Sequence, residues 1–518
     1  MAEAARARAR IVFTRTQVQR KYRKFKRAFR AALQVARVVA QVWVWARIGH
    51  LRWPVSRFWP ALTNADPKLR IPGQRSYGDH VMLRIAQLLL VALTALVFAP
   101  SLFAQPVLIG RITNPLTDAQ ANGTVRDPAL SGDGRYIYFV SDAGNLGASN
   151  NGGLNLFRYD LSAATPPANT VVLAMTGLGN GNSFAPSASA GGNRVAFESL
   201  SSNFGGGSPF TDVFVSEAFP LPQGEVGFDT FLVSRGLGGV APNEQSRFAS
   251  ISADGRYIVF FSDASNLVVG DSNNAPDIFL ADADNLAGAT ERISVDSNET
   301  PISGPSRALS NHAISSDGRY VVFAADAAIA GANPGNLEDV FLRDRSAGTT
   351  SLISQCNGGA AFVGSSDQAA ISPNGRYVVF RSFANNCGAV SGSHVFMRDR
   401  QTNTLSSLPV PPQSTICEEP RVADDGALVM QCASTEVGVA QQAYLYRGGF
   451  FYRLSTALVN PNGNNTSGSY LDLSSDGNSV VFDSTATDLV TGDTNAVSDV
   501  FLTVDFNVLN LLFTDGFE

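Results

Sequence analysis

The chain has 518 residues, of which 44% are hydrophobic and 16% are charged, and its formal net charge at pH 7 is −5. This balance excludes a mostly disordered chain and predicts a large globular portion. The near-neutral total hides a boundary in charge, because residues 1–81 hold 18 Lys and Arg against three acids and no lysine occurs after Lys68.

The first segment, residues 1–81, has a formal charge of about +15, and the remainder of the chain has about −20. Such a break indicates that two different pieces have been joined, or that the first piece is absent from the mature protein. The alternative is that the basic cluster from Gln19 to Arg30 is a cytoplasmic tail. An exported protein could not use this cluster, so no nucleic-acid partner is predicted.

Residues 82–104 have the pattern of a secretory signal peptide. A short start at Met82 precedes an apolar run from Leu88 to Phe98, and small residues lead to Ala104, after which cleavage is predicted. In the alternative hypothesis this segment of roughly 20 residues is an inner-membrane anchor, oriented by the basic residues before it. Export to the periplasm or beyond is preferred, because a start at Met82 explains the change in charge.

Residues 105–505 repeat a hairpin signature seven times. Its clearest copy, S-A-D-G-R-Y-I-V-F-F-S, begins at Ser252, and the Asp-Gly pair marks a tight turn because Gly accommodates positive φ. The turn glycines are Gly134, Gly192, Gly255, Gly318, Gly375, Gly426 and Gly477. A third strand of the D-V-F-L-R-D type follows each hairpin, beginning at Asn155, Asp212, Asp277, Asp339, His394, Ala443 and Asp499. With a fourth short strand in each unit, the repeats predict an all-β, seven-bladed β-propeller.

The S-x-D-G-R-Y signature followed by D-V-F-x-R-D resembles the TolB-like (WD40-like) family of bacterial β-propeller repeats. The resemblance covers the chain from about Val107 to Asp505 and implies a propeller fold. TolB itself carries an additional α/β domain before its propeller and works with the Tol–Pal machinery of the envelope. Nothing in this sequence matches that domain.

The last blade lacks a separate fourth strand, and Pro106 to Thr113 is predicted to supply it. This segment matches the fourth strands of the other units in place and spacing. The alternative is that Val508 to Phe513 completes the blade. Pairing of the N-terminal strand would tie the two ends of the propeller together.

In the first five units, an arginine opens the second strand and an acid ends the third. The pairs are Arg135 and Asp160, Arg194 and Glu217, Arg256 and Asp282, Arg319 and Asp344, and Arg376 and Asp399. Because antiparallel neighbours bring these ends together, we expect five salt bridges near the surface, each contributing little to stability.

All four cysteines lie in the later blades, and their positions predict two disulfides. Cys417 and Cys432 are equidistant from a hairpin turn, so strand pairing places them opposite each other. Cys356 and Cys387 lie in connections that emerge on the same propeller face. Two disulfides fit an oxidising compartment and therefore export, whereas the alternative is four reduced, buried thiols.

Two loops between second and third strands are candidate calcium sites. One offers Asp271, Asn273 and Asp277, and its counterpart in the seventh unit offers Asp493, Asn495 and Asp499. Alternating oxygen-bearing residues can converge on Ca²⁺, which takes about six to eight oxygen ligands. Neither loop has the later bidentate Glu of an EF-hand, and the alternative is that Asp and Asn cap the turns. No other cofactor is predicted.

The predicted propeller contains two histidines, His312 and His394. Neither has a metal-ligand or nucleophile companion nearby in the sequence, so a structural role is expected for both. The sequence also has no G-x-S-x-G elbow, H-E-x-x-H motif or phosphate loop. No catalytic residue is predicted.

The C-terminal residues 506–518 end in L-L-F-T-D-G-F-E, which resembles short endings on exported proteins of some proteobacteria. As an address, this tail would serve export and not the activity of the propeller. A frayed end is the alternative.

Three hypotheses for function remain. The lack of a catalytic constellation favours a non-enzymatic, monomeric scaffold that binds a protein or glycan through loops around the channel. A lyase or hydrolase could instead gather Asp or Arg residues from several blades at the channel mouth. A membrane-anchored sensor requires residues 1–81 to be retained. The scaffold is preferred, and the sequence identifies no ligand.

Overall fold

The computed structural model describes residues 107–112, 119–146, 152–161, 170–172, 179–221, 226–273, 275–307, 312–326, 337–388, 394–435, 440–455, 467–490 and 492–504. All of them belong to one compact unit, Leu96–Glu518. The basic segment, the signal peptide and the C-terminal tail predicted above lie outside the described residues. Within the described part, no helix has the length and apolar character needed to cross a membrane.

The described strands form seven four-stranded antiparallel sheets, which confirms the predicted all-β, seven-bladed propeller. Blade 1 contains β2 (Val125–Leu130), β3 (Tyr136–Ser141), β4 (Asn155–Asp160) and β5 (Thr170–Val172), and blade 2 contains β6 (Ser183–Ala188), β7 (Arg194–Ser199), β8 (Asp212–Pro220) and β9 (Val226–Leu232). Blade 3 contains β10 (Ser246–Ile251), β11 (Tyr257–Ser262), β12 (Asp277–Asp282) and β13 (Glu291–Arg292), and blade 4 contains β14 (Ser306–Arg307), β15 (Tyr320–Ala325), β16 (Asp339–Asp344) and β17 (Thr349–Leu352). Blades 5 and 6 contain β18 (Ser366–Ile371), β19 (Tyr377–Ser382), β20 (His394–Asp399) and β21 (Thr404–Ser407); and β22 (Ser414–Val422), β23 (Leu428–Ser434), β24 (Gln441–Arg447) and β25 (Phe450–Arg453). Blade 7 contains β26 (Ser467–Leu473), β27 (Ser479–Ser484), β28 (Asp499–Val504) and β1 (Val107–Arg111).

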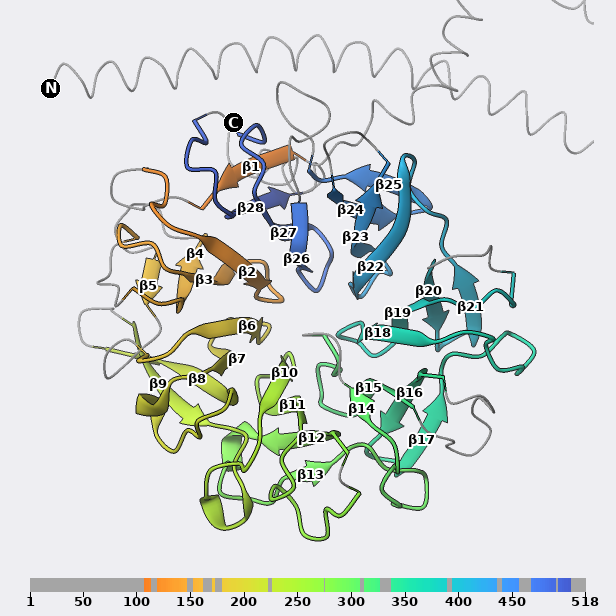
Figure 1. Cartoon of the computed structure of the whole chain (residues 1–518). Helices are drawn as coiled ribbons and strands as arrows, with labels where there is room; N and C mark the ends of the chain where they lie inside the picture. Colours follow the sequence, from red (N-terminus) through yellow and green to blue (C-terminus); the bar gives the residue numbers. More distant parts are fainter. Residues whose placement is uncertain are drawn as a thin grey trace, which may run out of the picture. The chain divides into compact units, whose positions relative to one another are not determined.

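The N-terminal strand closes the propeller, as predicted. Strand β1 pairs antiparallel with β28, with Val107 opposite Val504 and Arg111 opposite Phe501. In every blade the first strand lies nearest the centre, so that seven inner strands surround a channel (Figure 1). The alternative strand, Val508 to Phe513, lies outside the described residues.

The second and third strands form the core of each blade, because both of their faces pack against neighbouring blades. Strand β11, for example, has one half-buried residue followed by five buried ones. Phenylalanines from the two strands meet inside the blade, with ring centroids 6.0 Å apart for Phe260 and Phe279 and 5.8 Å apart for Phe323 and Phe341. These aromatic pairs supply much of the apolar area that each blade buries.

The turn glycines lock neighbouring blades together. Gly318 has a φ of +69°, and a Cβ at this position would lie 2.1 Å from Cδ2 of Tyr257 in the preceding blade. Only glycine satisfies both the turn and the close approach. The guanidinium of Arg345 lies 4.6 Å from the centroid of the same Tyr257 ring and pairs with Glu291 at 2.7 Å. The Gly and Tyr of the G-R-Y repeat are therefore explained by contacts between blades.

The five predicted salt bridges are all present at the rim of the propeller. Their N–O distances are 2.8, 3.0, 2.8, 2.7 and 2.7 Å for Arg135–Asp160, Arg194–Glu217, Arg256–Asp282, Arg319–Asp344 and Arg376–Asp399, respectively. The hydrogen bond from Arg319 is the main cause that holds the pKa of Asp344 well below its ordinary value. Asp344 is thus ionised and paired at neutral pH.

Candidate functional site

The four cysteines form the two predicted disulfides. Cys356 is bonded to Cys387 with 5.2 Å between their Cα atoms, and Cys417 is bonded to Cys432 with 4.0 Å. Cys417 lies directly opposite Cys432 in the register of β22 and β23. The first bridge joins two connections between strands, and the second joins two neighbouring strands of blade 6.

In the loop between β11 and β12, an arginine lies between the carboxylates that were candidates for calcium. Arg292 of β13 has its Nη2 atom 2.8 Å from Oδ1 of Asp271 and its Nη1 atom 3.6 Å from Oδ2 of Asp277. Asn273 donates to Asp277 at 3.1 Å, and its Oδ1 accepts the backbone N–H of Ala275 at 3.3 Å. Burial raises the pKa of Asp277.

The corresponding loop of blade 7 has the same arrangement. Nη1 of Arg111 lies 3.3 Å from Oδ1 of Asp493 and 3.7 Å from Oδ2 of Asp499. The amide of Gln120 donates to both carboxylates, and Asn495 donates to the carbonyl of Ala121 at 3.0 Å. Burial is the main cause that raises the pKa of Asp499 to about 6.

The guanidinium groups therefore supply the positive charge that these acidic loops require. Each arginine comes from the fourth strand of its own blade, at the position where a cation would bridge the two carboxylates. Among the described residues, no group of three or more His, Cys, Asp and Glu side chains has the arrangement of a metal site. Calcium binding by these loops therefore stays a prediction from the sequence.

The turns between first and second strands form a closed ring at one end of the channel, which we call the turn ring. Each turn is hydrogen-bonded to the turn of the next blade, through backbone groups in six cases and through the carboxylate of Asp424 between blades 5 and 6. The donors are the N–H groups of Asp133, Ala190, Asp254, Ser316, Asn374, Asp424 and Ser475. The blades are thus linked continuously around this end.

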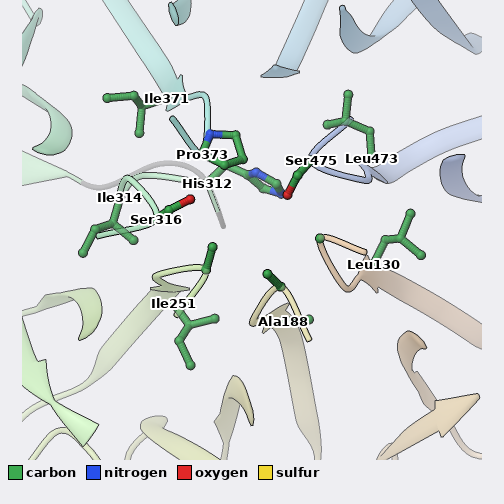
Figure 2. A pocket seen from close by; sticks show the side chains of 13 residues that line it. Leu130, Ala188, Ile251, His312, Ile314, Ser316, Ile371, Pro373, Leu473 and Ser475 are labelled. Carbon is green, nitrogen blue, oxygen red and sulfur yellow. The ribbon is translucent and has the colours of Figure 1, made fainter. Parts of the chain in front are cut away.

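Inside the turn ring lies a cavity lined in part by His312, whose carboxylate partner Asp472 is buried. The cavity has a volume of about 430 Å³ including its open mouth, and apolar residues from several inner strands line it (Figure 2). Nε2 of His312 lies 2.6 Å from Oδ1 of the buried Asp472, whose Oδ2 accepts the backbone N–H of Leu130 at 2.8 Å. His312 belongs to blade 4 and Asp472 to blade 7, so the pair connects two blades that are not neighbours. His394 opens β20, opposite Ser382 in the strand register.

Further along the channel, bulges interrupt the inner strands and force ordinary residues into positive φ. The φ angles are 51° at Asp127, 44° at Ala185, 54° at Phe248, 50° at Gln368 and 52° at Glu419. Each bulge involves two consecutive residues, and we call these five dipeptides the bulge ring: Arg126–Asp127, Phe184–Ala185, Arg247–Phe248, Asp367–Gln368 and Glu418–Glu419. Each such angle costs of order 1–3 kcal/mol and persists only where its surroundings enforce it.

Buried carboxyl groups enforce several of these bulges by accepting their N–H groups. Glu198 accepts the N–H of Phe248 at 2.7 Å, Asp483 accepts that of Tyr470 at 2.9 Å, and Asp127 accepts that of Ala185 at 3.3 Å. Burial is the main cause that raises the pKa of Glu198 and of Asp483 to about 7, and it also raises the pKa of Asp127. At neutral pH Glu198 and Asp483 can therefore hold or release a proton.

The two sides of the bulge ring differ in how their charges are paired. On blades 5 and 6, Arg381 binds Asp367 and Glu418, each at 2.5 Å. On blades 1 and 3, the guanidinium groups of Arg126 and Arg247 have buried Nε atoms with no hydrogen-bond partner among the described residues. The first side carries one guanidinium against two carboxylates, whereas each guanidinium of the second side keeps an N–H group without a hydrogen-bond partner among the described residues.

Sequence reasoning missed both rings and Asp472, although two signals were present. Pro128, Pro186 and Pro420 interrupt predicted first strands, and proline inside a strand marks an edge or a bulge. Asp472 is charged at a position where the equivalent residues include Ala129 and Ser187. His312 does have a carboxylate companion, but that companion lies 160 residues away.

Comparisons with known proteins give similar solved structures of low sequence identity, among them a β-propeller domain. Neither a protein family nor a curated protein matches the sequence. The chain is a β-propeller. The propeller domain of the trilobed protease from Pyrococcus furiosus is 10% identical, covering 74% of this chain and 93% of that chain, with a TM-score of 0.45. An oligogalacturonate lyase in complex with manganese is 13% identical, covering 78% and 98%, with a TM-score of 0.46.

A putative TolB from Agrobacterium tumefaciens is also among the similar structures. It is 14% identical, covers 55% of this chain and 84% of that chain, and has a TM-score of 0.34. The manganese and the activities named for these proteins are properties of those proteins. Function in this chain has to be sought in its own residues.

Proposed function

We propose that this protein is an exported, non-enzymatic scaffold that takes a protein or glycan ligand into its central channel at the bulge ring. The observation that carries the proposal is the change of side chain from blade to blade at one level of the channel. The equivalent positions hold Arg126, Phe184, Arg247, Asp367 and Glu418. Neighbouring aromatic and charged groups offer the specific contacts of a ligand site.

Backbone strain at the same level supports the proposal. Five residues other than glycine adopt positive φ in the bulge ring. Phe248, at one bulge, is 41% exposed, and Tyr470 of β26 is 47% exposed, although both side chains are large and aromatic. Strained backbone and exposed aromatic side chains both accompany binding sites.

The binding proposal is tested by screening native protein on arrays of glycans and envelope proteins. A variant with Arg126, Phe184 and Arg247 all changed to alanine is compared with the rim variant Arg319→Ala. We expect at least one ligand that binds the native protein and the rim variant but loses about tenfold or more in affinity for the channel variant. If every ligand binds the channel variant as well as the native protein, the proposal fails.

Export is supported by the two disulfides, which form and persist in oxidising compartments. The test is the intact mass and N-terminal sequence of protein purified from its native host, with and without reduction. We expect a start near Gln105 and a gain of about four hydrogen masses on reduction, two for each disulfide. A start near Met1 with free thiols would contradict export and favour the anchored form.

A second candidate function is a lyase or hydrolase that works in the same channel. It is favoured by the pKa of about 7 for Glu198 and Asp483, since a general acid or base works best near the operating pH. Incubation with glycan and peptide mixtures, followed by mass spectrometry, tests it. Product formation that disappears in Glu198→Gln while binding persists would establish the enzyme, and unchanged mixtures would exclude it for those substrates.

A further inference from the structure

The guanidinium of Arg126 has an unusual environment for a partly buried arginine. Among the described residues it donates no hydrogen bond, and its Nε lies 3.8 Å from Oδ1 of Asp127, beyond hydrogen-bonding distance. That Oδ1 atom, on a residue only 3% exposed, also has no hydrogen-bond partner among the described residues. The guanidinium carbon lies 5.8 Å from the centroid of the Phe184 ring. The Nε atom is buried, but the side chain is 35% exposed, so its other N–H groups are the donors that a ligand entering the channel could meet.

Arg247 occupies the equivalent position two blades further on. Its guanidinium donates to Gln245, whereas its Nε is buried without a partner in the described part of the chain. Phe184 belongs to the blade between the two arginines, and the ring of Phe248, next to Arg247, packs on Phe261 with 5.9 Å between centroids. Consecutive blades 1, 2 and 3 thus present a guanidinium, an aromatic ring and a guanidinium at the same level.

The chemistry of this row selects an anionic ligand. A guanidinium binds carboxylates through two parallel N–H donors, and such charge-assisted bonds are roughly twice as strong as neutral ones. An aromatic ring packs against a flat apolar surface, such as the C–H face of a sugar ring. A carboxylate carried directly on a sugar ring satisfies both groups together. Acidic peptides carry their carboxylates on flexible side chains and offer no flat face between them.

We propose that the bulge ring binds an anionic glycan, with Arg126 and Arg247 pairing with carboxylates on its sugars and Phe184 packing against a sugar ring between them. This inference rests on the proposed function, because it names the ligand class of the same channel site. On the opposite side, Arg381 binds both Asp367 and Glu418 and offsets only one of their two negative charges, so an anionic ligand is expected on the side of blades 1 to 3.

The test is isothermal titration of the native protein with an oligogalacturonate, a neutral cello-oligosaccharide of equal length and a glutamate-rich peptide. We expect binding of the oligogalacturonate alone, with an affinity that falls as salt is raised. Arg126→Ala and Arg247→Ala should each weaken it about tenfold or more, and Phe184→Ala several-fold. Arg126→Lys keeps the charge without the planar fork and should give an intermediate affinity. Melting temperatures identify any variant that fails to fold. If Arg126→Ala fails to fold, the affinity of Arg126→Lys for the oligogalacturonate is the deciding measurement.

The control is Arg319→Ala, which removes the same charge at the rim and should bind as the native protein does. The inference is overturned if the oligogalacturonate does not bind, if it binds the arginine variants unchanged, or if the peptide or the neutral glycan binds more tightly. The proposed function survives those results as long as another ligand on the arrays is lost in the channel variant. Failure of both tests removes the channel as a binding site.

Discussion

The rim and the bulge ring use the same residue types in opposite ways. At the rim, arginine and an acid recur as a bonded pair in five blades, and hydrogen bonds from Arg376 and Arg319 hold the pKa of Asp399 at about 2 and lower that of Asp344. In the channel, burial raises the pKa of Glu198 and Asp483 to about 7, and the side chains change from blade to blade. The repeated contacts build the fold, whereas the unrepeated ones are those that the proposed function assigns to a ligand.

The largest effect is expected from a turn glycine, since it would break the repeated side of this comparison. Gly318→Ala forces a Cβ to within 2.1 Å of Tyr257 at a φ of +69°. We expect a loss of about 3 kcal/mol or more in the free energy of unfolding, measured by urea denaturation. Gly358→Ala is the matched control, because a Cβ there meets nothing within 4 Å. Equal losses in both variants would contradict the locking role of the turn.

The disulfide of blade 6 should have the next largest effect. This blade has Ala427 in place of the rim arginine, and Cys417 and Cys432 join its first two strands across 15 residues. Replacing both by alanine should lower the free energy of unfolding by about 3 kcal/mol. The same measurement under reducing conditions should abolish the difference between variant and native protein. A variant as stable as the oxidised protein would show that strand pairing alone suffices.

A pH experiment separates the channel from the rim. Glu198 is protonated in both folded and unfolded states at low pH, but between about pH 4 and pH 7 only the unfolded state releases its proton. The native protein should therefore lose up to about 3 kcal/mol through this group as the pH rises over that range. Glu198→Gln lacks this loss and should gain stability relative to the native protein between pH 5 and pH 8, measured by urea denaturation.

Asp344→Asn is the control at the rim, and its pH dependence has the opposite sign. Because Arg319 lowers the pKa of Asp344, the stability from this carboxylate is present above the unfolded-state pKa and is lost as the pH falls below it. The difference between this variant and the native protein should be constant from pH 5 to pH 8. A parallel pH dependence in the two variants would mean that Glu198 is not buried as described.

The smallest effect is expected from a single rim arginine. Arg319→Ala removes one exposed ion pair of 2.7 Å and should lower the melting temperature by less than about 2 °C. Raising the salt concentration should reduce even this difference, since exposed pairs are screened. A much larger shift, or one independent of salt, would show that the rim contributes directly to the stability of the ring of blades.

The sequence predicted every feature that depends on local repetition or on strand register. The seven blades, closure by Val107–Arg111, the rim ion pairs and the opposed Cys417 and Cys432 all follow from spacing along paired strands. Repetition also allows the units to be compared, and Ala427 and Asn478 depart from the arginine pattern of the first five units.

The channel could not be predicted because its contacts join residues that are remote in sequence. Arg111 reaches Asp493 and Asp499 only after the propeller has closed. The sequence therefore does not reveal that these two carboxylates pair with an arginine. The bulges shift the register of the inner strands. Simple alternation of residues along a strand therefore does not predict which side chains lie beside the channel. His312 and Asp472 meet for the same reason, across two blades that are not consecutive.

Closure by β1 determines the order in which this chain can finish folding. Its partner β28 is made about 400 residues later, and the entropy cost of such a loop grows only with the logarithm of its length. Each blade can dock on the previous one as it is completed, but the ring remains open until the last blade captures the first strand. A circular permutant that joins the ends at β28 and begins between two blades would replace this late encounter by a covalent link and should fold faster. Translocation in an unfolded state is compatible with this order, since the closing contact cannot form before almost the whole propeller has emerged.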